Sequence, residues 1–249
     1  MNQKFLASLV IASLFFACSP NNVKFDAGIT KILDSAGVQG SFALMENGSG
    51  QFTIANLSRY KDSAYSPLNT FFIIPSLIAL DKGIINQNPS SWASADSIKF
   101  YQDLMSQLGR ETIRRMMDSI HYGKGLVNAD LNEFWRDQSL RITADEQLGL
   151  IKKMYFRELP FQKRSQELYK KMISKEDNSN YHLSYIEATD PLKQISWVVG
   201  FVEENKHIYF FVLNTNARAK GLENQPSSKS SVPLLKAILL QQGFLKGLR

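Results

Sequence analysis

Alternating and continuous apolar positions predict two pairs of β-strands, one near each end of the chain. Residues 40–45 and 51–55 are apolar runs, and the intervening Glu46-Asn-Gly-Ser-Gly50 tolerates the positive φ angles of a hairpin turn. Residues 195–202 and 207–214 are rich in β-branched and aromatic side chains and flank a short polar turn. Each pair is therefore expected to form a hairpin.

The middle of the chain has the period of helices. A largely apolar helix is expected over residues 71–80, ending near Gly83, because nearly every position is apolar and glycine follows. Thr143-Ala-Asp-Glu146 has the spacing of a capping box, in which the threonine oxygen accepts from the Glu146 amide. Further helices are expected over residues 100–108, from Ile113 onward, over 143–155 and over 165–173.

Two amphipathic helices are expected at the ends, over residues 25–36 and 232–243. The order is therefore strands, a helical insertion, strands and a final helix. A hairpin sheet must cover at least one apolar face, so the terminal helices are expected to pack on a sheet built from both strand pairs. This order predicts an α/β (α+β) fold with an antiparallel sheet, in one domain over residues 25–249 with a helical subdomain at about 66–175.

Composition supports a folded chain. The 249 residues are 44% hydrophobic, which is enough for a sizeable core. The formal net charge of +6 comes partly from lysines and arginines on the expected helices, where they form a solvated face. A weak attraction to anionic cell-wall polymer or lipid headgroups follows, and nucleic acid is not expected as a partner.

The first residues have the features of an export signal. Lys4 precedes an apolar run up to Ala17, too short to span a bilayer, so residues 1–17 are expected to be a signal peptide. Cys18 follows directly and resembles the acylated cysteine of a bacterial lipobox, with residues 18–24 as a lipidated tether. The alternative is an ordinary signal peptide with an incidental cysteine. The expected location is the bacterial cell envelope, exported and lipid-anchored, at the outer membrane or facing the periplasm.

Several motifs carry a resemblance to a known family over about residues 40–245. They occur in the family's order: Ser66-Pro67, Leu77-Ile-Ala-Leu80, Tyr101-Gln102, Tyr122-Gly123, Phe134-Trp135, Arg141-Ile-Thr-Ala-Asp-Glu-Gln147, Trp197-Val-Val-Gly-Phe-Val-Glu203 and Phe210-Phe-Val-Leu-Asn214. The chain thus resembles the class D (oxacillinase-type) β-lactamases and penicillin-binding sensor domains. The resemblance implies a β-lactamase/transpeptidase-like fold.

The family's catalytic residues do not occur at the matching positions. The resemblance places the nucleophilic serine at Asn69 and the general-base lysine three residues later at Phe72. It places the serine of the second motif at Asp96, unless a slip of one residue brings in Ser97, and the lysine of the Lys-Thr-Gly motif at Ile186. An amide and a phenyl ring can neither attack a lactam nor accept a proton, so no catalytic residue is expected.

Other chemistry has weaker support in the sequence. Thr70 and Ser66 are hydroxyls beside Asn69, and each is expected to be structural because neither has a base partner in the sequence. Asp96 and Glu187 could form an acid/base pair for glycan hydrolysis, but solvated charges at a rim are the simpler interpretation. The three histidines lack ligand spacing, so neither a metal nor another cofactor is expected.

The sequence therefore favours a non-catalytic lipoprotein of the penicillin-recognising fold. Its cleft rim, with Asn69, Asp96, Tyr122, Tyr185 and Glu187 as candidates, would bind a peptidoglycan peptide or an envelope protein. One alternative is a divergent β-lactamase or transpeptidase-like serine hydrolase with a relocated nucleophile, acting on β-lactams or peptidoglycan peptides. Another is a scaffold at the membrane surface, which would be favoured if Phe72 fills the former active-site cavity.

Overall fold

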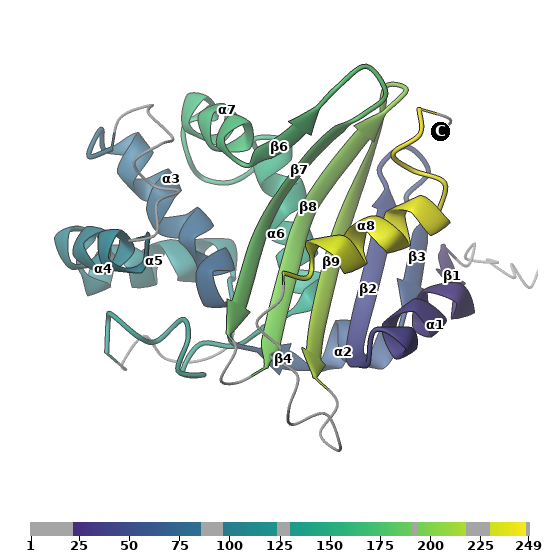
Figure 1. Ribbon diagram of the computed structural model, residues 1–249. Coiled ribbons are helices and arrows are strands. Elements are labelled where there is room, and N and C mark those ends of the chain that lie inside the picture. The colour runs from purple at the N-terminus through teal and green to yellow at the C-terminus, as the bar shows by residue number, and fades with distance from the viewer. Residues whose placement is uncertain (1–21, 86–96, 124–129, 191–193, 218–229, 248–249) are drawn as a thin grey trace, which may run out of the picture.

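The computed structural model describes residues 22–85, 97–123, 130–190, 194–217 and 230–247. A seven-stranded sheet in the order β1-β3-β2-β9-β8-β7-β6 forms its centre (Figure 1). The strands are β1 (Val23–Phe25), β2 (Val38–Glu46), β3 (Phe52–Ala55), β6 (Ser174–Asp177), β7 (His182–Asp190), β8 (Ile195–Glu204) and β9 (His207–Ala217).

Both expected hairpins are present and lie side by side. β2 pairs with β3, β8 pairs with β9, and β2 joins the two hairpins by pairing with β9 in antiparallel register from Val38↔Ala217 to Glu46↔Tyr209. The sheet is mixed rather than purely antiparallel, because β1 pairs in parallel with β3. It also contains β6 and β7, two strands that the hydrophobic pattern did not identify.

The terminal helices cover one face of the sheet, as expected. α1 (Ala27–Ser35) and α8 (Val232–Gln241) contact each other and lie across this face (Figure 1). α1 begins at Ala27 rather than Phe25, because the Asp26 side chain accepts from the Gly28 amide at 2.8 Å and caps the helix there. A buried apolar cluster joins both helices to the sheet; we call it the α8-side core: Ile29, Leu33, Phe42, Leu44, Ala55, Leu183, Val198, Val202, Tyr209, Phe211, Leu213, Leu235, Ile238, Leu239 and Phe244.

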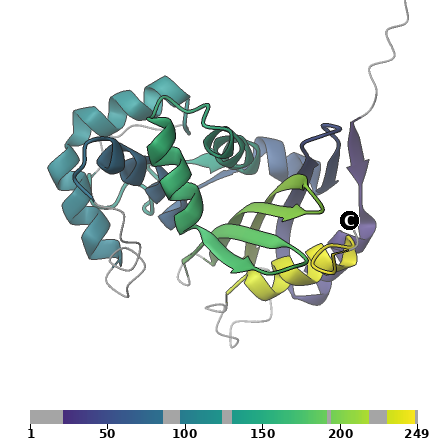
Figure 2. The ribbon, with the colours of Figure 1, turned by 90° about the horizontal axis from the view of Figure 1, so that it is seen from above.

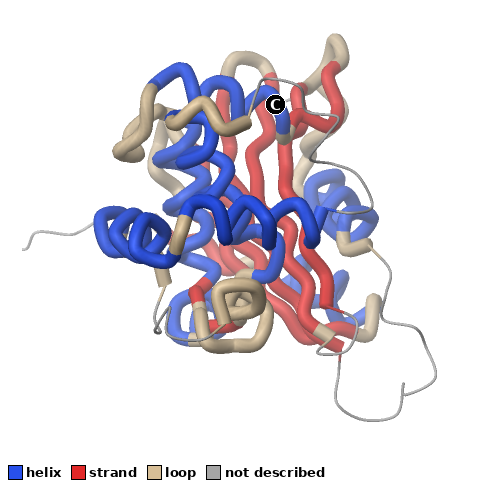
Figure 3. Tube along the Cα trace, turned by 90° about the vertical axis from the view of Figure 1, so that its left-hand side faces the viewer, coloured by secondary structure: helices blue, strands red, loops and turns tan. Residues whose placement is uncertain are grey.

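The remaining helices pack against the other face and beside it. Helix α6 contacts β8 and β9, while α3, α4 and α5 form a group beside the sheet (Figures 2 and 3). The elements are α2 (Leu57–Asp62), β4 (Ala64–Tyr65), the 3-10 helix η1 (Leu68–Phe72), α3 (Ile73–Asp81), α4 (Ser97–Leu108), α5 (Arg110–Ile120), β5 (Ile142–Thr143), α6 (Ala144–Tyr155) and α7 (Lys163–Met172), with β4 and β5 paired as a small second sheet. Within the described ranges, no helix has both the length and the apolar content needed to cross a membrane.

Two local features follow the sequence closely. The capping box at the start of α6 is complete, since Thr143 Oγ1 accepts from the Glu146 amide at 3.2 Å and Glu146 Oε2 accepts from the Thr143 amide at 2.8 Å. Gly200 on β8 is required by close packing, because a Cβ there would lie 2.0 Å from the Ser184 carbonyl oxygen on β7.

Candidate functional site

The segment that resembles a nucleophile helix is buried in the core. The expected apolar helix is present, but it begins as the 3-10 helix η1 before continuing as α3. Leu68, the first residue of η1, has φ of 52°, an unusual conformation for a non-glycine residue, and its amide donates to the Trp135 carbonyl at 3.0 Å. The strained residue directly precedes Asn69, which is partly exposed.

Phe72 fills the position that the resemblance assigns to the general base. Its side chain is 5% exposed and stacks on Tyr101, with centroids 3.7 Å apart and ring planes 15° apart. The Trp135 ring closes the cluster at a centroid distance of 5.7 Å from Phe72. Tyr101 shares a hydrogen bond of 2.8 Å with Ser76 Oγ, and burial raises the pKa of Tyr101 to about 12. This aromatic cluster of Phe72, Tyr101 and Trp135 provides no group that could take a proton at neutral pH.

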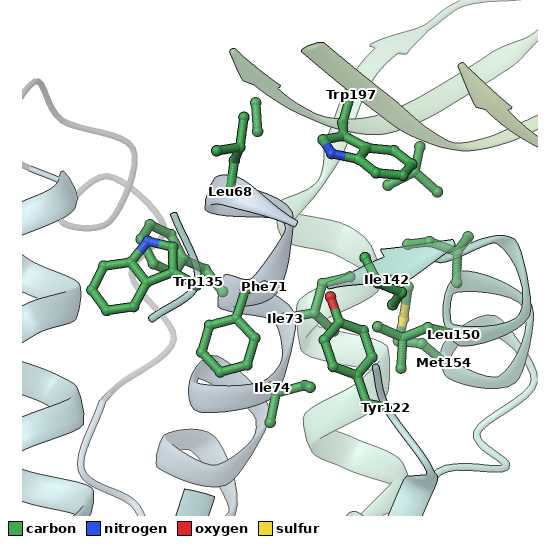
Figure 4. Close-up of a cluster of buried hydrophobic side chains, with 14 of the residues drawn as sticks. Leu68, Phe71, Ile73, Ile74, Tyr122, Trp135, Ile142, Leu150, Met154 and Trp197 are labelled. Atoms are coloured by element: carbon green, nitrogen blue, oxygen red, sulfur yellow. The ribbon is translucent and has the colours of Figure 1, made fainter. Parts of the chain in front are cut away.

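Tyr122 lies inside the core rather than at a rim. It is 5% exposed and packs beside Phe71, which also contacts Trp135 (Figure 4). Its hydroxyl donates to Gln147 Oε1 at 3.3 Å, and burial raises the pKa of Tyr122 well above its usual value. The prediction of a rim position for Tyr122 is therefore wrong, because its ring is needed to fill the core between η1 and α6.

The side chains of Thr70 and Ser66, near Asn69, are both buried; the Thr70 hydroxyl is hydrogen-bonded, whereas Ser66 Oγ has no hydrogen-bond partner among the described residues. Thr70 Oγ1 donates to the Pro67 carbonyl at 2.5 Å and accepts from Gln147 Nε2, and the Thr70 side chain is fully buried. Ser66 is also fully buried, and its carbonyl accepts from Trp197 Nε1 at 2.9 Å. Neither hydroxyl contacts a carboxylate, lysine or histidine in the described part of the chain, so no described residue activates either one as a nucleophile.

The residues assigned to the Lys-Thr-Gly motif lie on β7 beside η1. Ile186 and Ala188 pack with the buried cluster that contains Phe71 and Phe72. Glu187 is on the opposite face, where its Oε1 accepts from the Ser231 amide at 2.7 Å at the start of α8. Tyr185 also packs against the α8-side core. The structure therefore separates the Tyr185 and Glu187 side chains from the η1 face of the sheet. Asp96 lies outside the described residues, as does Cys18.

Part of the outer edge of β7 has no described strand beside it. β6 pairs only with residues 182–184 of β7, and the Tyr185 amide donates to the Ile173 carbonyl at 3.0 Å just beyond that pairing. Backbone groups alternate in direction along a strand, so those of Glu187 and Thr189 also point to this outer side. Since η1 contacts β7, this edge lies next to the segment that carries Asn69.

A serine, a histidine and an aspartate meet elsewhere, on β6 and β7. Ser184 Oγ is 3.0 Å from His182 Nε2, and His182 Nδ1 is 3.5 Å from Asp177 Oδ1. The order resembles a hydrolytic triad, but the Ser184 side chain is fully buried. Ser184 is also four residues from Ala188, which belongs to the segment assigned to the Lys-Thr-Gly motif, and four residues span roughly 13 Å along a strand. This contact therefore does not supply the relocated nucleophile. The signal in the sequence was the i, i+2 spacing of His182 and Ser184, which puts both on one face of a strand.

Among the residues with defined positions, no three histidine, cysteine or carboxylate side chains gather as metal ligands would. The region is therefore characterised by the aromatic cluster, the buried hydroxyls and the part of the β7 edge with no described strand beside it.

Comparisons with known proteins agree with this fold. No family model matches the chain. The β-lactamase OXA-48 of Klebsiella pneumoniae is 28% identical over 201 residues, which cover 71% of this chain and 75% of that enzyme. The crystal structure of the class D β-lactamase YbXI from Nostoc superposes with a TM-score of 0.74 at 23% identity, covering 88% of this chain and 100% of that one. The chain is homologous to the class D β-lactamases and has their fold.

The similarity to class D β-lactamases extends to a longer regulatory protein. BlaR1 of Bacillus licheniformis is 26% identical over 250 residues, which cover 90% of this chain but only 40% of BlaR1. The chain is therefore similar both to β-lactamases over most of their length and to one part of a longer regulatory protein.

Proposed function

We propose that this protein is a non-catalytic, penicillin-recognising-fold lipoprotein of the bacterial cell envelope, and that it acts by binding rather than by hydrolysis. The observation that carries the proposal is the stacking of Phe72 on Tyr101 within the core. A serine hydrolase of this fold needs an activated hydroxyl beside a proton acceptor. Asn69 and Phe72 occupy the positions that the resemblance gives to those two groups, and neither has the required chemistry.

Among the residues with defined positions, the neighbouring hydroxyls offer no substitute. Thr70 is buried and engaged by Pro67 and Gln147, and Ser184 is buried on a different part of β7. Losing the nucleophile and the base together removes a unit that acts cooperatively, so a small residual activity from one of them is not expected. Homology to enzymes does not supply an activity when the site lacks these groups.

The partner proposed is an extended cell-wall peptide that lies along the outer edge of β7. The backbone groups of Glu187 and Thr189 point outward there, and Asn69 on η1 is partly exposed nearby. An extended peptide adds to such an edge through main-chain hydrogen bonds. Because Phe72 fills the interior, the ligand would be held at the surface of the sheet rather than in a deep cavity.

The location in the envelope rests on the first residues of the sequence. The apolar run up to Ala17 and the single cysteine that follows it support export and acylation of Cys18. A lipid at Cys18, with the short polar segment after it, would hold the folded part near a membrane surface.

Peptide binding is tested with two substitutions at one residue. The purified protein is titrated with a peptidoglycan stem tetrapeptide by isothermal calorimetry. Thr189→Pro removes an outward amide from the β7 edge, whereas Thr189→Val keeps it and removes only the hydroxyl that contacts Ser196. We expect Thr189→Pro to weaken peptide binding about tenfold or more, because the peptide loses a main-chain hydrogen bond and the strand edge is distorted. Thr189→Val should change the affinity less than about twofold. Equal binding by both variants, or none by the unchanged protein, would contradict the edge site.

The alternative function is a divergent β-lactamase or transpeptidase-like serine hydrolase, which the homology to OXA-48 favours. A chromogenic cephalosporin distinguishes the two. The proposal predicts that its hydrolysis in the presence of the protein is no faster than in buffer. A rate proportional to protein concentration that survives further purification would establish the alternative.

A further inference from the structure

A pocket at the end of the sheet lies apart from the aromatic cluster. It has a volume of about 460 Å³ and is bounded by α1, the start of β2 and the segment from α2 to β4. That volume is in the range of small-molecule sites. The residues lining it are mostly polar, with Arg59 and Asp34 as its charged members and Leu33, Val38 and Tyr65 as its larger apolar surfaces.

Arg59 is an unusual residue to find in this wall. Its side chain is only 9% exposed, and both Nε and Nη2 donate to Asn214 Oδ1, at 3.1 and 2.7 Å. The guanidinium also lies over the Tyr65 ring, with Cζ 4.4 Å from the ring centroid. These contacts hold the guanidinium plane in one orientation, which is the condition for binding a planar anion through several donors.

No carboxylate among the described residues forms a salt bridge with Arg59. Within the described ranges Arg59 forms no salt bridge, and its Nη1 has no hydrogen-bond partner. Burial lowers the pKa of Arg59 from its usual value, so the surroundings disfavour the cation. Buried charges are normally paired, and an arginine bordering a pocket without a carboxylate partner has capacity for an external anion.

We propose that this pocket binds a small organic carboxylate, whose oxygens accept from Arg59 and whose apolar part lies against Leu33, Val38 and Tyr65. A monocarboxylate with an apolar part fits better than inorganic phosphate, because phosphate cannot use the apolar surface of Leu33, Val38 and Tyr65. Exposed hydroxyl groups around the mouth, such as those of Thr30 and Ser58, can bind polar substituents of the ligand. This site uses none of the residues proposed for the β7 edge.

Binding at the Arg59 pocket is tested with a matched pair of probes. Hippurate carries a carboxylate and an aromatic ring, and its primary amide differs only in lacking the charge. Saturation-transfer NMR and calorimetry on the full protein are expected to show hippurate binding at least about tenfold more tightly than the amide, because a hydrogen bond to a charged group is stronger than one to a neutral group. Equal affinities for the two probes, or no hippurate binding, would overturn the proposal.

Two substitutions locate the site. Arg59→Gln removes the cation and should abolish the preference for hippurate over its amide. Ser58→Trp should block the mouth from an exposed position on α2 while leaving Arg59 and its contact with Asn214 in place, so it serves if Arg59→Gln fails to fold. Loss of hippurate binding in Ser58→Trp supports the site, and unchanged binding there overturns it. Inorganic phosphate competing more strongly than hippurate would also overturn the carboxylate assignment.

Discussion

Phe72 lies face to face with Tyr101, and the two ring centroids are only 3.7 Å apart. The contact joins the start of α3 to α4, since Phe72 ends η1 and Tyr101 lies within α4. The resemblance places the family's general-base lysine at this position, but here the position is Phe72, which packs against Tyr101 and Trp135. The same position therefore contributes stability to the fold.

Replacing Phe72 with alanine should destabilise the protein by about 3–5 kcal/mol, because it leaves a cavity beside Tyr101 and Trp135. Urea unfolding followed by circular dichroism measures this. Phe25→Ala is the matched control, since Phe25 is 61% exposed and its loss should change stability by less than about 0.5 kcal/mol. Similar effects of both substitutions would show that Phe72 does not pack as described.

Stability should fall at alkaline pH, in part because of Tyr101. Burial raises the pKa of Tyr101 from 10.0 to about 12. A folded-state pKa above the unfolded value means that this contribution is complete below about pH 10 and is lost as pH rises towards 12, for a total of about 3 kcal/mol.

The test compares the slope of unfolding free energy against pH, from pH 8 to 11.5, in the unchanged protein and in Tyr101→Phe. The variant should show a shallower slope. Some slope should persist, because burial also raises the pKa of Tyr122 and Tyr169. Identical slopes would count against a buried Tyr101 hydroxyl.

Thr70→Val should show that the Thr70 hydroxyl stabilises the fold. The substitution keeps the shape of the side chain but removes the oxygen that accepts from Gln147 Nε2. The Gln147 side chain is fully buried. An unsatisfied buried donor costs about 1–3 kcal/mol, so unfolding in urea should occur at lower concentration. Thr30→Val on the exposed side of α1 is the control and should be nearly neutral. A catalytic Thr70 would be indicated instead if the variant were stable but lost a measurable hydrolysis.

Cys18→Ser should release the protein from membranes, because it removes the only thiol in the sequence that could be acylated. Cells labelled with a clickable palmitate analogue should give a labelled band for the unchanged protein and none for the variant. Fractionation should then move the variant to the soluble envelope fraction. Membrane association without labelling in both forms would refute the anchor.

Much of the fold could be predicted from the sequence because its strongest elements have regular patterns. The hairpins at 40–55 and 195–214 have compact turns and continuous apolar runs, and the capping box at Thr143 fixes the start of α6. β7 was missed since its polar residues interrupt the apolar run, although Leu183 and Tyr185 alternate with His182 and Ser184. β1 was missed because three residues carry too little pattern to identify an edge strand.

The candidate site was only partly predictable. The sequence alone places Asn69 and Phe72 where the resemblance expects the family's nucleophile and base, but the packing of Phe72 on Tyr101 requires the fold. The rim assignment failed for Tyr122 because a motif gives position along the chain and not depth in the core. Which face of β7 carries Glu187 depends on strand register, and its contact with Ser231 joins residues 44 positions apart.

The most direct test of the account is the intact mass of the protein after incubation with a fluorescent penicillin, with OXA-48 as the positive control. No adduct is expected on the unchanged protein. None is expected on Asn69→Ser either, because the position that the resemblance gives to the base is still occupied by Phe72. A stoichiometric penicilloyl adduct on the unchanged protein would contradict the non-catalytic assignment.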